Sequence, residues 1–236
     1  METKLKDGAL SYGIELSPQQ ISDFMAYMAL LREWNEKINL TAIIEPEEII
    51  TKHFLDSMSV YATGYVQENT SVIDVGTGAG FPGLVMKIAK PEIKLTLLDS
   101  LAKRLNFLQT VCNEANIDDV NFVHARAEDG GQNPEYREKY DVAVARAVAN
   151  MSTLSEYLLP FVKVGGYFIA MKGPLADEEL EKAKKAIAIL GGEIEKVEEV
   201  QVPFTDLRHR IVIVKKIKSC PKEYPRKAGT PSKKPL

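Results

Sequence analysis

The segment from Asp74 to Gly83 reads DVGTGAGFPG and holds four glycines directly after the apolar run SVI. Glycine permits left-handed backbone conformations and lets the main chain approach a ligand closely. A tight turn between a strand and a helix needs fewer glycines, so we expect this loop to lie against a bound molecule. Pro82 suits the first helical position, which places the loop at the start of a helix.

Short apolar runs alternate with helical segments beyond this loop. We expect strands at 71–76, 94–99, 120–125, 141–146 and 165–172, and helices at 82–90, 101–116, 151–160 and 176–190. This alternation predicts βαβ units and a mostly parallel sheet. The runs GEIEKVEEVQVP and RHRIVIVKKI follow without a helix between them and predict an antiparallel hairpin. The fold class is therefore α/β, with a seven-stranded sheet arranged as in Rossmann-like class I methyltransferases.

The first part of the chain is expected to be a helical extension of this fold. Ser17, Pro18 and Gln20 form the pattern of a capping box ahead of an apolar stripe with helical spacing. A second helix is expected to begin near Pro46. We expect three parts: a helical region at 1–66, a methyltransferase domain at 67–218 and a basic tail at 219–236.

The charge of the chain is unevenly distributed. The net charge is −3, whereas the segment from Lys215 onward holds eight Lys or Arg and one Glu, so it carries +7 and the remainder −10. This asymmetry fits either a segment that meets a polyanion or a disordered solubilising tail. The chain shows no signal peptide and no membrane-spanning run, and its two cysteines make neither a disulfide framework nor a metal site. We expect a cytoplasmic protein without a metal.

The glycine loop fits two kinds of nucleotide. Gly78, Gly80 and Gly83 satisfy the dinucleotide pattern G-x-G-x-x-G, which keeps an NAD-linked oxidoreductase as an alternative. Asp74, two residues before Gly76, instead fits S-adenosylmethionine sites, where such a carboxylate orders the loop or reaches the methionine amino group. A pyrophosphate would gain nothing from a carboxylate so close to it.

Acidic residues end the next two predicted strands. Asp99 lies at the end of the second strand, where a carboxylate can accept both ribose hydroxyls of either nucleotide, and it can also cap the following helix. Ala127 and Glu128 follow the third strand, where an adenine would lie. His53 is expected to be a structural hydrogen-bonding group near the cofactor.

Several segments together resemble the RsmG family, also called GidB, of 16S rRNA guanine-N7 methyltransferases. They are EWNEKINLTAI, HFLDS, VIDVGTGAGFPG, LLDSLAKRLNFL, RAED, ARAVA, LLPFVKVGG and YPRKAGTPSKKP, and they span nearly the whole chain in order. The resemblance implies methyl transfer from S-adenosylmethionine to one guanine of 16S rRNA in the small ribosomal subunit, by a protein that we expect to be a monomer.

The resemblance also implies roles for particular residues. The cofactor contacts fall on Gly76, Gly78, Phe81, Asp99, Ala127, Glu128 and Arg146. The candidate catalytic residues are Arg146, Arg126 and Lys172. Where the family has an arginine near the last strand, this sequence has His209 between Arg208 and Arg210, so the assignment at that position stays open.

The residues themselves favour guanine N7 over other targets. The sequence ARAVAN stands where an adenine-N6 enzyme has Asn/Asp-Pro-Pro-aromatic, and neither cysteine lies where a pyrimidine-C5 enzyme needs one. N7 carries an in-plane lone pair and needs no deprotonation, so alignment alone can promote the reaction. An RNA-binding module that has lost activity remains a further alternative.

Overall fold

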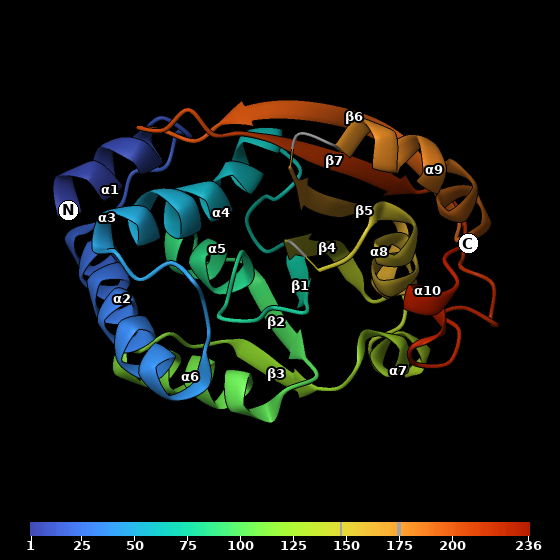
Figure 1. The fold of residues 1–236 in the computed structure, drawn as a ribbon, viewed down its shortest axis with the longest axis horizontal. Coiled ribbons are helices and arrows are strands. Elements are labelled where there is room, and N and C mark those ends of the chain that lie inside the picture. Colours follow the sequence, from blue (N-terminus) through green and yellow to red (C-terminus); the bar gives the residue numbers. More distant parts are fainter. Residues whose placement is uncertain (147, 174–175) are drawn as a thin grey trace.

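The computed structural model describes residues 1–146, 148–173 and 176–236. Its centre is one seven-stranded sheet in the order β3-β2-β1-β4-β5-β7-β6 (Figure 1). The strands are β1 (Ser71–Val75), β2 (Lys94–Asp99), β3 (Val120–His124), β4 (Tyr140–Arg146), β5 (Val162–Lys172), β6 (Gly192–Gln201) and β7 (Arg208–Lys216). β7 lies between β5 and β6 and runs antiparallel to both, whereas all other neighbouring strands pair in parallel. The predicted α/β fold with a terminal antiparallel hairpin is confirmed.

The four helices predicted after the glycine loop are present within two residues of the expected bounds. They are α5 (Gly83–Ala89), α6 (Ala102–Glu114), α8 (Met151–Leu158) and α9 (Ala176–Ile189). Sequence patterning missed three others: α1 (Glu2–Leu10), α7 (Ala127–Gln132) and α10 (Thr230–Lys233). The last two are too short for an apolar repeat to mark them.

The N-terminal helices form as the capping signals predict. Helix α2 (Pro18–Ile38) begins with a capping box, in which Ser17 Oγ accepts from Gln20 N at 3.2 Å and Gln20 Oε1 accepts from Ser17 N at 2.9 Å. The second predicted helix is present as one continuous helical segment with irregular turns. It runs through α3 (Pro46–Ile49), a π-helical turn η1 (Ile50–Leu55), α4 (Asp56–Met58) and a 3₁₀ turn η2 (Ser59–Thr63).

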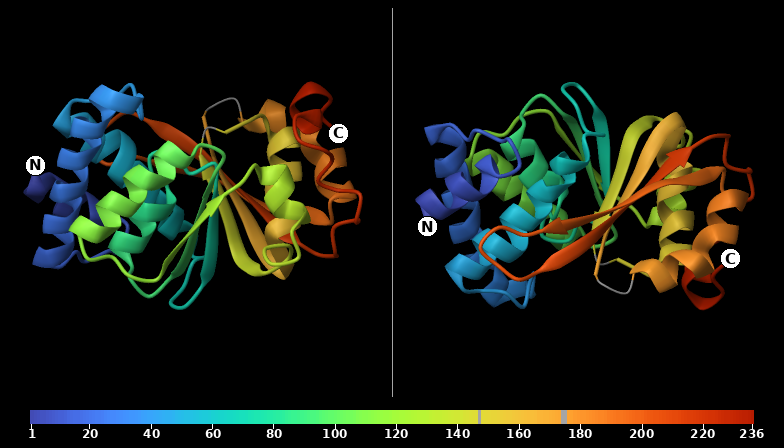
Figure 2. Two further views of the ribbon diagram at one scale, coloured as in Figure 1. Left: turned by 90° about the horizontal axis from the view of Figure 1, so that it is seen from below. Right: turned by 90° about the horizontal axis from the view of Figure 1, so that it is seen from above.

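Helices cover both faces of the sheet (Figure 2). The N-terminal helices share one face with α5 and α6, and α8 and α9 cover the other. Alternate residues of β1 supply the two cores: Val72 faces the N-terminal helices, and Ile73 and Val75 face α8. The division into parts at residues 66 and 218 stays a prediction. Residues from both sides of position 66 share one hydrophobic core.

Helix α2 contacts the glycine loop directly. The Tyr27 hydroxyl donates to the Ala79 carbonyl, and the Gln20 amide donates to the Ile88 carbonyl at 2.7 Å, at the end of α5. Gly80 adopts a φ of +96° beside the Tyr27 hydroxyl. The N-terminal helices therefore fix the position of the loop at the end of β1.

Replacing Gly80 tests this contact. An added Cβ would overlap the Tyr27 hydroxyl and lie 2.7 Å from Leu108 Cδ2, in addition to the strain of its positive φ. We expect Gly80→Ala to lower the free energy of unfolding by about 2–4 kcal/mol, measured by urea denaturation. Gly13 has a φ of +73° with nothing within 4 Å of an added Cβ. Gly13→Ala should cost only the strain of its φ, about 1–2 kcal/mol, and equal losses would contradict the tight contact.

Candidate cofactor site

A cavity of about 510 Å³ opens at the carboxyl ends of β1 to β4. In a doubly wound sheet this edge is where ligands bind, beside the point at which strand order reverses. Eight of the nine site residues predicted from the sequence line it. These are Gly76, Gly78, Phe81, Asp99, Arg126, Ala127, Glu128 and Arg146.

The floor of the cavity is ordered by the buried carboxylate of Asp74. Its Oδ2 accepts from Thr77 Oγ1 at 2.7 Å and from Gly83 N at 2.8 Å, so one oxygen ties the two ends of the glycine loop together. Burial raises the pKa of Asp74 to about 6. Its Oδ1 is buried without a hydrogen-bond partner in the part of the chain that the structure describes. Of the two roles predicted for Asp74, loop ordering is the one seen.

The glycine loop folds back onto the neighbouring strand. Gly76 and Gly78 adopt φ values of +74° and +60°, in the region that glycine enters most readily. The amides of Gly76 and Thr77 both donate to the Leu98 carbonyl, at 2.8 and 3.1 Å. The loop backbone therefore lines the cavity in a conformation that β2 supports.

Asp99 connects the loop to the start of α6. It is 1% exposed, and its oxygens accept from Gly78 N and from Leu101 N, both at 2.9 Å. Arg104 lies 3.3 Å from Oδ2. The N-cap residue of α6 is Leu101, which has no side-chain cap hydrogen bond, so the predicted cap by Asp99 is not formed; the carboxylate instead holds the Leu101 amide and lines the cavity.

Ala127 and Glu128 form the first turn of α7 at the far end of the cavity. Glu128 is 6% exposed, and its Oε1 accepts from the backbone N–H of Gly229 at 2.8 Å. A segment from the C-terminal part of the chain therefore closes this end. No sequence pattern indicated that contact.

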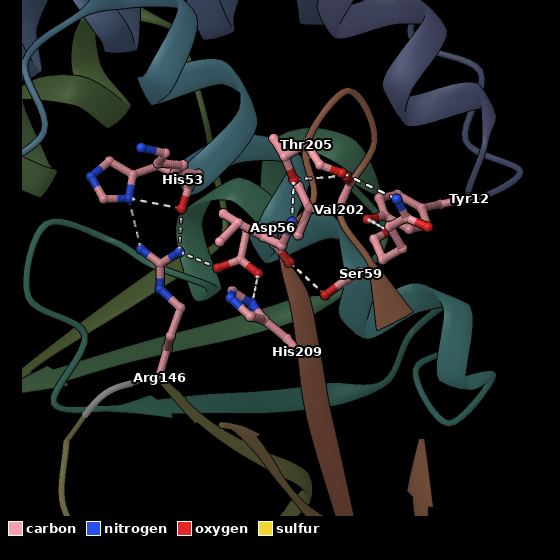
Figure 3. A network of polar contacts seen from close by, with 11 residues as sticks. Tyr12, His53, Asp56, Ser59, Arg146, Val202, Thr205 and His209 are labelled. Atoms are coloured by element: carbon pink, nitrogen blue, oxygen red, sulfur yellow. Dashed lines mark hydrogen bonds and ion pairs between the residues drawn. The ribbon is translucent and has the colours of Figure 1, made fainter. Parts of the chain in front are cut away.

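Arg146 lies at the end of β4 in a network of polar contacts (Figure 3). Its Nη1 donates to Asp56 Oδ2 at 2.6 Å and to the Lys52 carbonyl at 3.0 Å, and its Nη2 lies 3.1 Å from His53 Nδ1. The guanidinium also lies over the Phe81 ring, 4.9 Å from its centre. Opposite charge, hydrogen bonds and a cation–π contact thus hold Arg146 beside the loop.

His53 and His209 occupy opposite electrostatic environments in this network. His53 stacks on Phe81 at 4.3 Å, and burial, aided by Arg146, lowers its pKa to about 4. Nδ1 also lies 3.2 Å from the Lys52 carbonyl, which already accepts from Arg146 Nη1. Because a guanidinium only donates, we assign Nδ1 as the acceptor from Arg146, with Nε2 donating to Thr41 Oγ1 at 2.8 Å. His209 Nδ1 instead bonds to Asp56 Oδ1, and that bond raises the pKa of His209.

The remaining predicted residues lie in different places. Arg126 is exposed at the rim of the cavity. Lys172 lies outside the cavity lining, where it donates to the Ala149 carbonyl at 2.9 Å and pairs with Glu179 at 2.7 Å. Arg208 and Arg210 form ion pairs with Glu199 and Asp177, so His209 alone of these three contacts Asp56. Ala147 in the ARAVA segment lies outside the described residues.

Five residues of the cavity wall come from segments that sequence patterning did not place at the site. These are Leu40, Thr41, Tyr157, Gly229 and Ser232. Asn35 signals the first two, because its side chain accepts from the amides of Leu40 and Thr41 at 2.6 and 2.8 Å and so turns the chain toward the cavity. Gly229 and Ser232 belong to a segment that charge alone presented as a tail.

The inserted antiparallel β7 distinguishes this sheet from the all-parallel sheets of dinucleotide-binding domains. Together with the cavity at the ends of β1 to β4, it defines a Rossmann-like class I methyltransferase. Two solved structures share this fold: the YcgJ protein of Bacillus subtilis has a TM-score of 0.52 at 12% identity, covering 71% of this chain and all of that one. The antibiotic-resistance methyltransferase Kmr has a TM-score of 0.52 at 20% identity, covering 66% of this chain and 91% of that one.

The family follows from sequence comparison. The family model for GidB, described as rRNA small subunit methyltransferase G, matches residues 20–210. A relative from Alkaliphilus oremlandii is 56% identical and one from Alkaliphilus metalliredigens 53% identical, each over the full length of both chains. Both are named ribosomal RNA small subunit methyltransferase G. The chain therefore belongs to the GidB family of small-subunit rRNA methyltransferases, which confirms the predicted resemblance.

The described residues contain neither a metal-ligand cluster nor a helix that could span a membrane. In the ranges 1–146, 148–173 and 176–236, no three His, Cys, Asp or Glu side chains gather as metal ligands would. The helices in those ranges likewise lack the length and apolar character that would let one cross a bilayer.

The opposite environments of the two histidines can be measured by NMR titration of their rings. We expect the pKa of His209 to lie above the ordinary histidine value of about 6.5 and His53 to stay neutral down to about pH 4. Stability contributed by the His209–Asp56 contact is present below pH 6.5 and lost as pH rises through the folded pKa of His209. Burial of neutral His53 has the opposite sign, since stability is lost as pH falls from 6.5 toward 4.

Asp56→Asn provides the control for this titration. It removes the charge beside His209, so the pKa of that ring should fall back toward 6.5. The His53 ring should still titrate well below 6.5, because burial is the main cause of its shift. Titration of both rings near 6.5 in the unmodified protein would contradict the assigned network.

Proposed function

We propose that this protein transfers the methyl group of S-adenosylmethionine to N7 of a guanine in 16S rRNA of the small ribosomal subunit. The observation that carries the proposal is the cavity between the glycine loop and Asp99 in a chain of the GidB family. The left-handed glycines leave a cradle without side chains, and the buried carboxylate offers acceptors for ribose hydroxyls. This set of groups fits a nucleoside cofactor.

The chain's residues divide the binding between them. Asp99 would hold the ribose, Gly76 and Gly78 would line the sulfonium nucleoside, and Ala127 and Glu128 would border the adenine. S-adenosylmethionine, when bound, supplies an electrophilic methyl group on a positively charged sulfur. Arg146 and Phe81 lie at the opposite end of the cavity from Glu128, where the methionine portion would extend.

The site suits a nucleophile that needs no base. His53 has its two ring nitrogens directed at Thr41 and Arg146, and its low pKa leaves it neutral. The Asp74 carboxylate is buried beneath the loop and already accepts two hydrogen bonds. Guanine N7 brings its own lone pair, so the chain has only to orient the base and exclude water. Arg126 at the rim can donate to a phosphate or to guanine O6.

A dinucleotide is less well accommodated, although the G-x-G-x-x-G pattern is present. In dinucleotide sites the amides at the helix N-terminus receive the pyrophosphate. Here the Gly83 amide at the start of α5 already donates to Asp74. A negatively charged diphosphate would approach a carboxylate at that point.

The direct test is methylation of small ribosomal subunits with labelled S-adenosylmethionine, followed by mapping of the modified base. We expect label at N7 of one guanine of 16S rRNA. Label on another base would overturn the assignment to N7. Binding of NADH without binding of S-adenosylmethionine would favour the oxidoreductase, and cofactor binding without label would indicate an inactive RNA-binding module.

Asp99 should contribute more to cofactor affinity than a neighbouring carboxylate outside the cavity. We expect Asp99→Ala to weaken binding of S-adenosylhomocysteine by about tenfold to a hundredfold, because two ribose hydrogen bonds to a charged acceptor are lost. Calorimetric titration measures this. Asp129→Asn, an exposed position of α7 outside the cavity lining, is the matched control and should bind normally. Equal affinities for both variants would remove Asp99 from the ribose site.

A further inference from the structure

The segment after β7 is docked onto the body along most of its length. Arg137 donates to four backbone carbonyls, of which three belong to this segment: Tyr224 O at 2.7 Å, Cys220 O at 2.9 Å and Pro221 O at 3.1 Å. Gln132 donates to Pro225 O at 2.9 Å, and Glu138 accepts from Cys220 N at 2.7 Å. Polar side chains around α7 therefore recognise the backbone of the segment directly, as they would a bound peptide.

Two of the eight basic residues from Lys215 onward, one at the end of β7 and one in this segment, are used inside the protein. Lys216 is fully buried and donates to the Leu159 carbonyl at 2.6 Å. Arg226 makes a bidentate contact with Glu156, at 2.9 and 2.6 Å, and Glu156 is completely buried. A buried carboxylate without its cation would be strongly unfavourable, so Glu156 fixes where Arg226 must lie. This contact places the residues that follow against α8.

The docked segment then reaches the cofactor cavity. Gly229 N donates to Glu128 Oε1, and Thr153 Oγ1 donates to the Pro231 carbonyl at 3.1 Å. Gly229 and Ser232 line the cavity together with Tyr157 of α8. Figure 1 shows α10 beside α7 and α8, at the edge of the molecule where β3 ends. Gly229 has a φ of +82°, which allows its N–H to face Glu128.

We propose that residues 226–232 form a wall of the nucleoside pocket, held by Glu156 and Glu128, rather than a free arm for RNA alone. The occupant is the adenosine portion of the cofactor, so this inference rests on the proposed function. Glu128 receives the wall with one oxygen and borders the pocket, so ordering of the segment and binding of the nucleoside stabilise each other. Such coupling is reciprocal: what loosens the wall weakens the ligand, and the ligand tightens the wall.

Calorimetric titration with S-adenosylhomocysteine tests the wall. Arg226→Gln removes the bidentate contact but keeps the chain complete, and a second variant ends at Glu223. We expect about a tenfold loss of affinity for Arg226→Gln and a larger loss for the shortened chain. The double variant Lys222→Ala/Lys233→Ala is the control. It removes two exposed charges outside the cavity lining and should bind the nucleoside normally while binding rRNA more weakly.

Hydrogen–deuterium exchange supplies a readout that a merely structural segment would not move. In the unmodified protein, saturating S-adenosylhomocysteine should slow exchange at residues 226–232, and the Gly229 amide most of all. Unchanged exchange there, or unchanged affinity in Arg226→Gln, would overturn the inference. If the unmodified protein binds no S-adenosylhomocysteine, the proposed function fails instead, so the two failures are distinguishable.

Discussion

The buried Asp74 carboxylate is the constraint on which the site depends. One of its oxygens binds both Thr77 and Gly83, so the loop between them has its shape before any ligand enters. Asp99 grips the same loop from the next strand through Gly78. The N-terminal helices complete this support through Tyr27, which holds the Ala79 carbonyl. A cofactor would therefore meet a preorganised surface, which lowers the entropic cost of binding.

The two ends of the cavity carry side chains of opposite charge. At one end, cationic Arg146 is held by Asp56 and by the face of the Phe81 ring, and neutral His53 lies 3.1 Å from its Nη2. At the other end, the Glu128 carboxylate is held by a backbone amide of the C-terminal segment. An elongated ligand with a carboxylate at one end and a nucleoside at the other matches this polarity.

The sheet was predictable because each strand carries its own local signal. The glycine loop, Asp99 and the short apolar runs identify β1 and β2 without reference to distant residues. The contacts of Asp56 and Glu128 could not be predicted in the same way, because their partners His209 and Gly229 lie 153 and 101 residues away in sequence. A charge count likewise cannot separate buried from exposed cations near the C-terminus. Lys216 donates to the Leu159 carbonyl and Arg226 pairs with buried Glu156, so neither is a free surface charge. The roles assigned to Arg146, Arg126 and Lys172, and those of the predicted cofactor contacts, stay predictions.

Asp56 belongs to an irregular helical turn, yet it serves two strands at once. Its separate oxygens hold Arg146 from β4 and His209 from β7. Loss of this carboxylate would leave Arg146 and His209 without their shared acceptor, whereas loss of either partner would leave the other bond intact. Natural variation at position 209 should therefore be limited to side chains that can donate to a carboxylate. Substitution of Asp56 should require simultaneous substitution of Arg146 and His209.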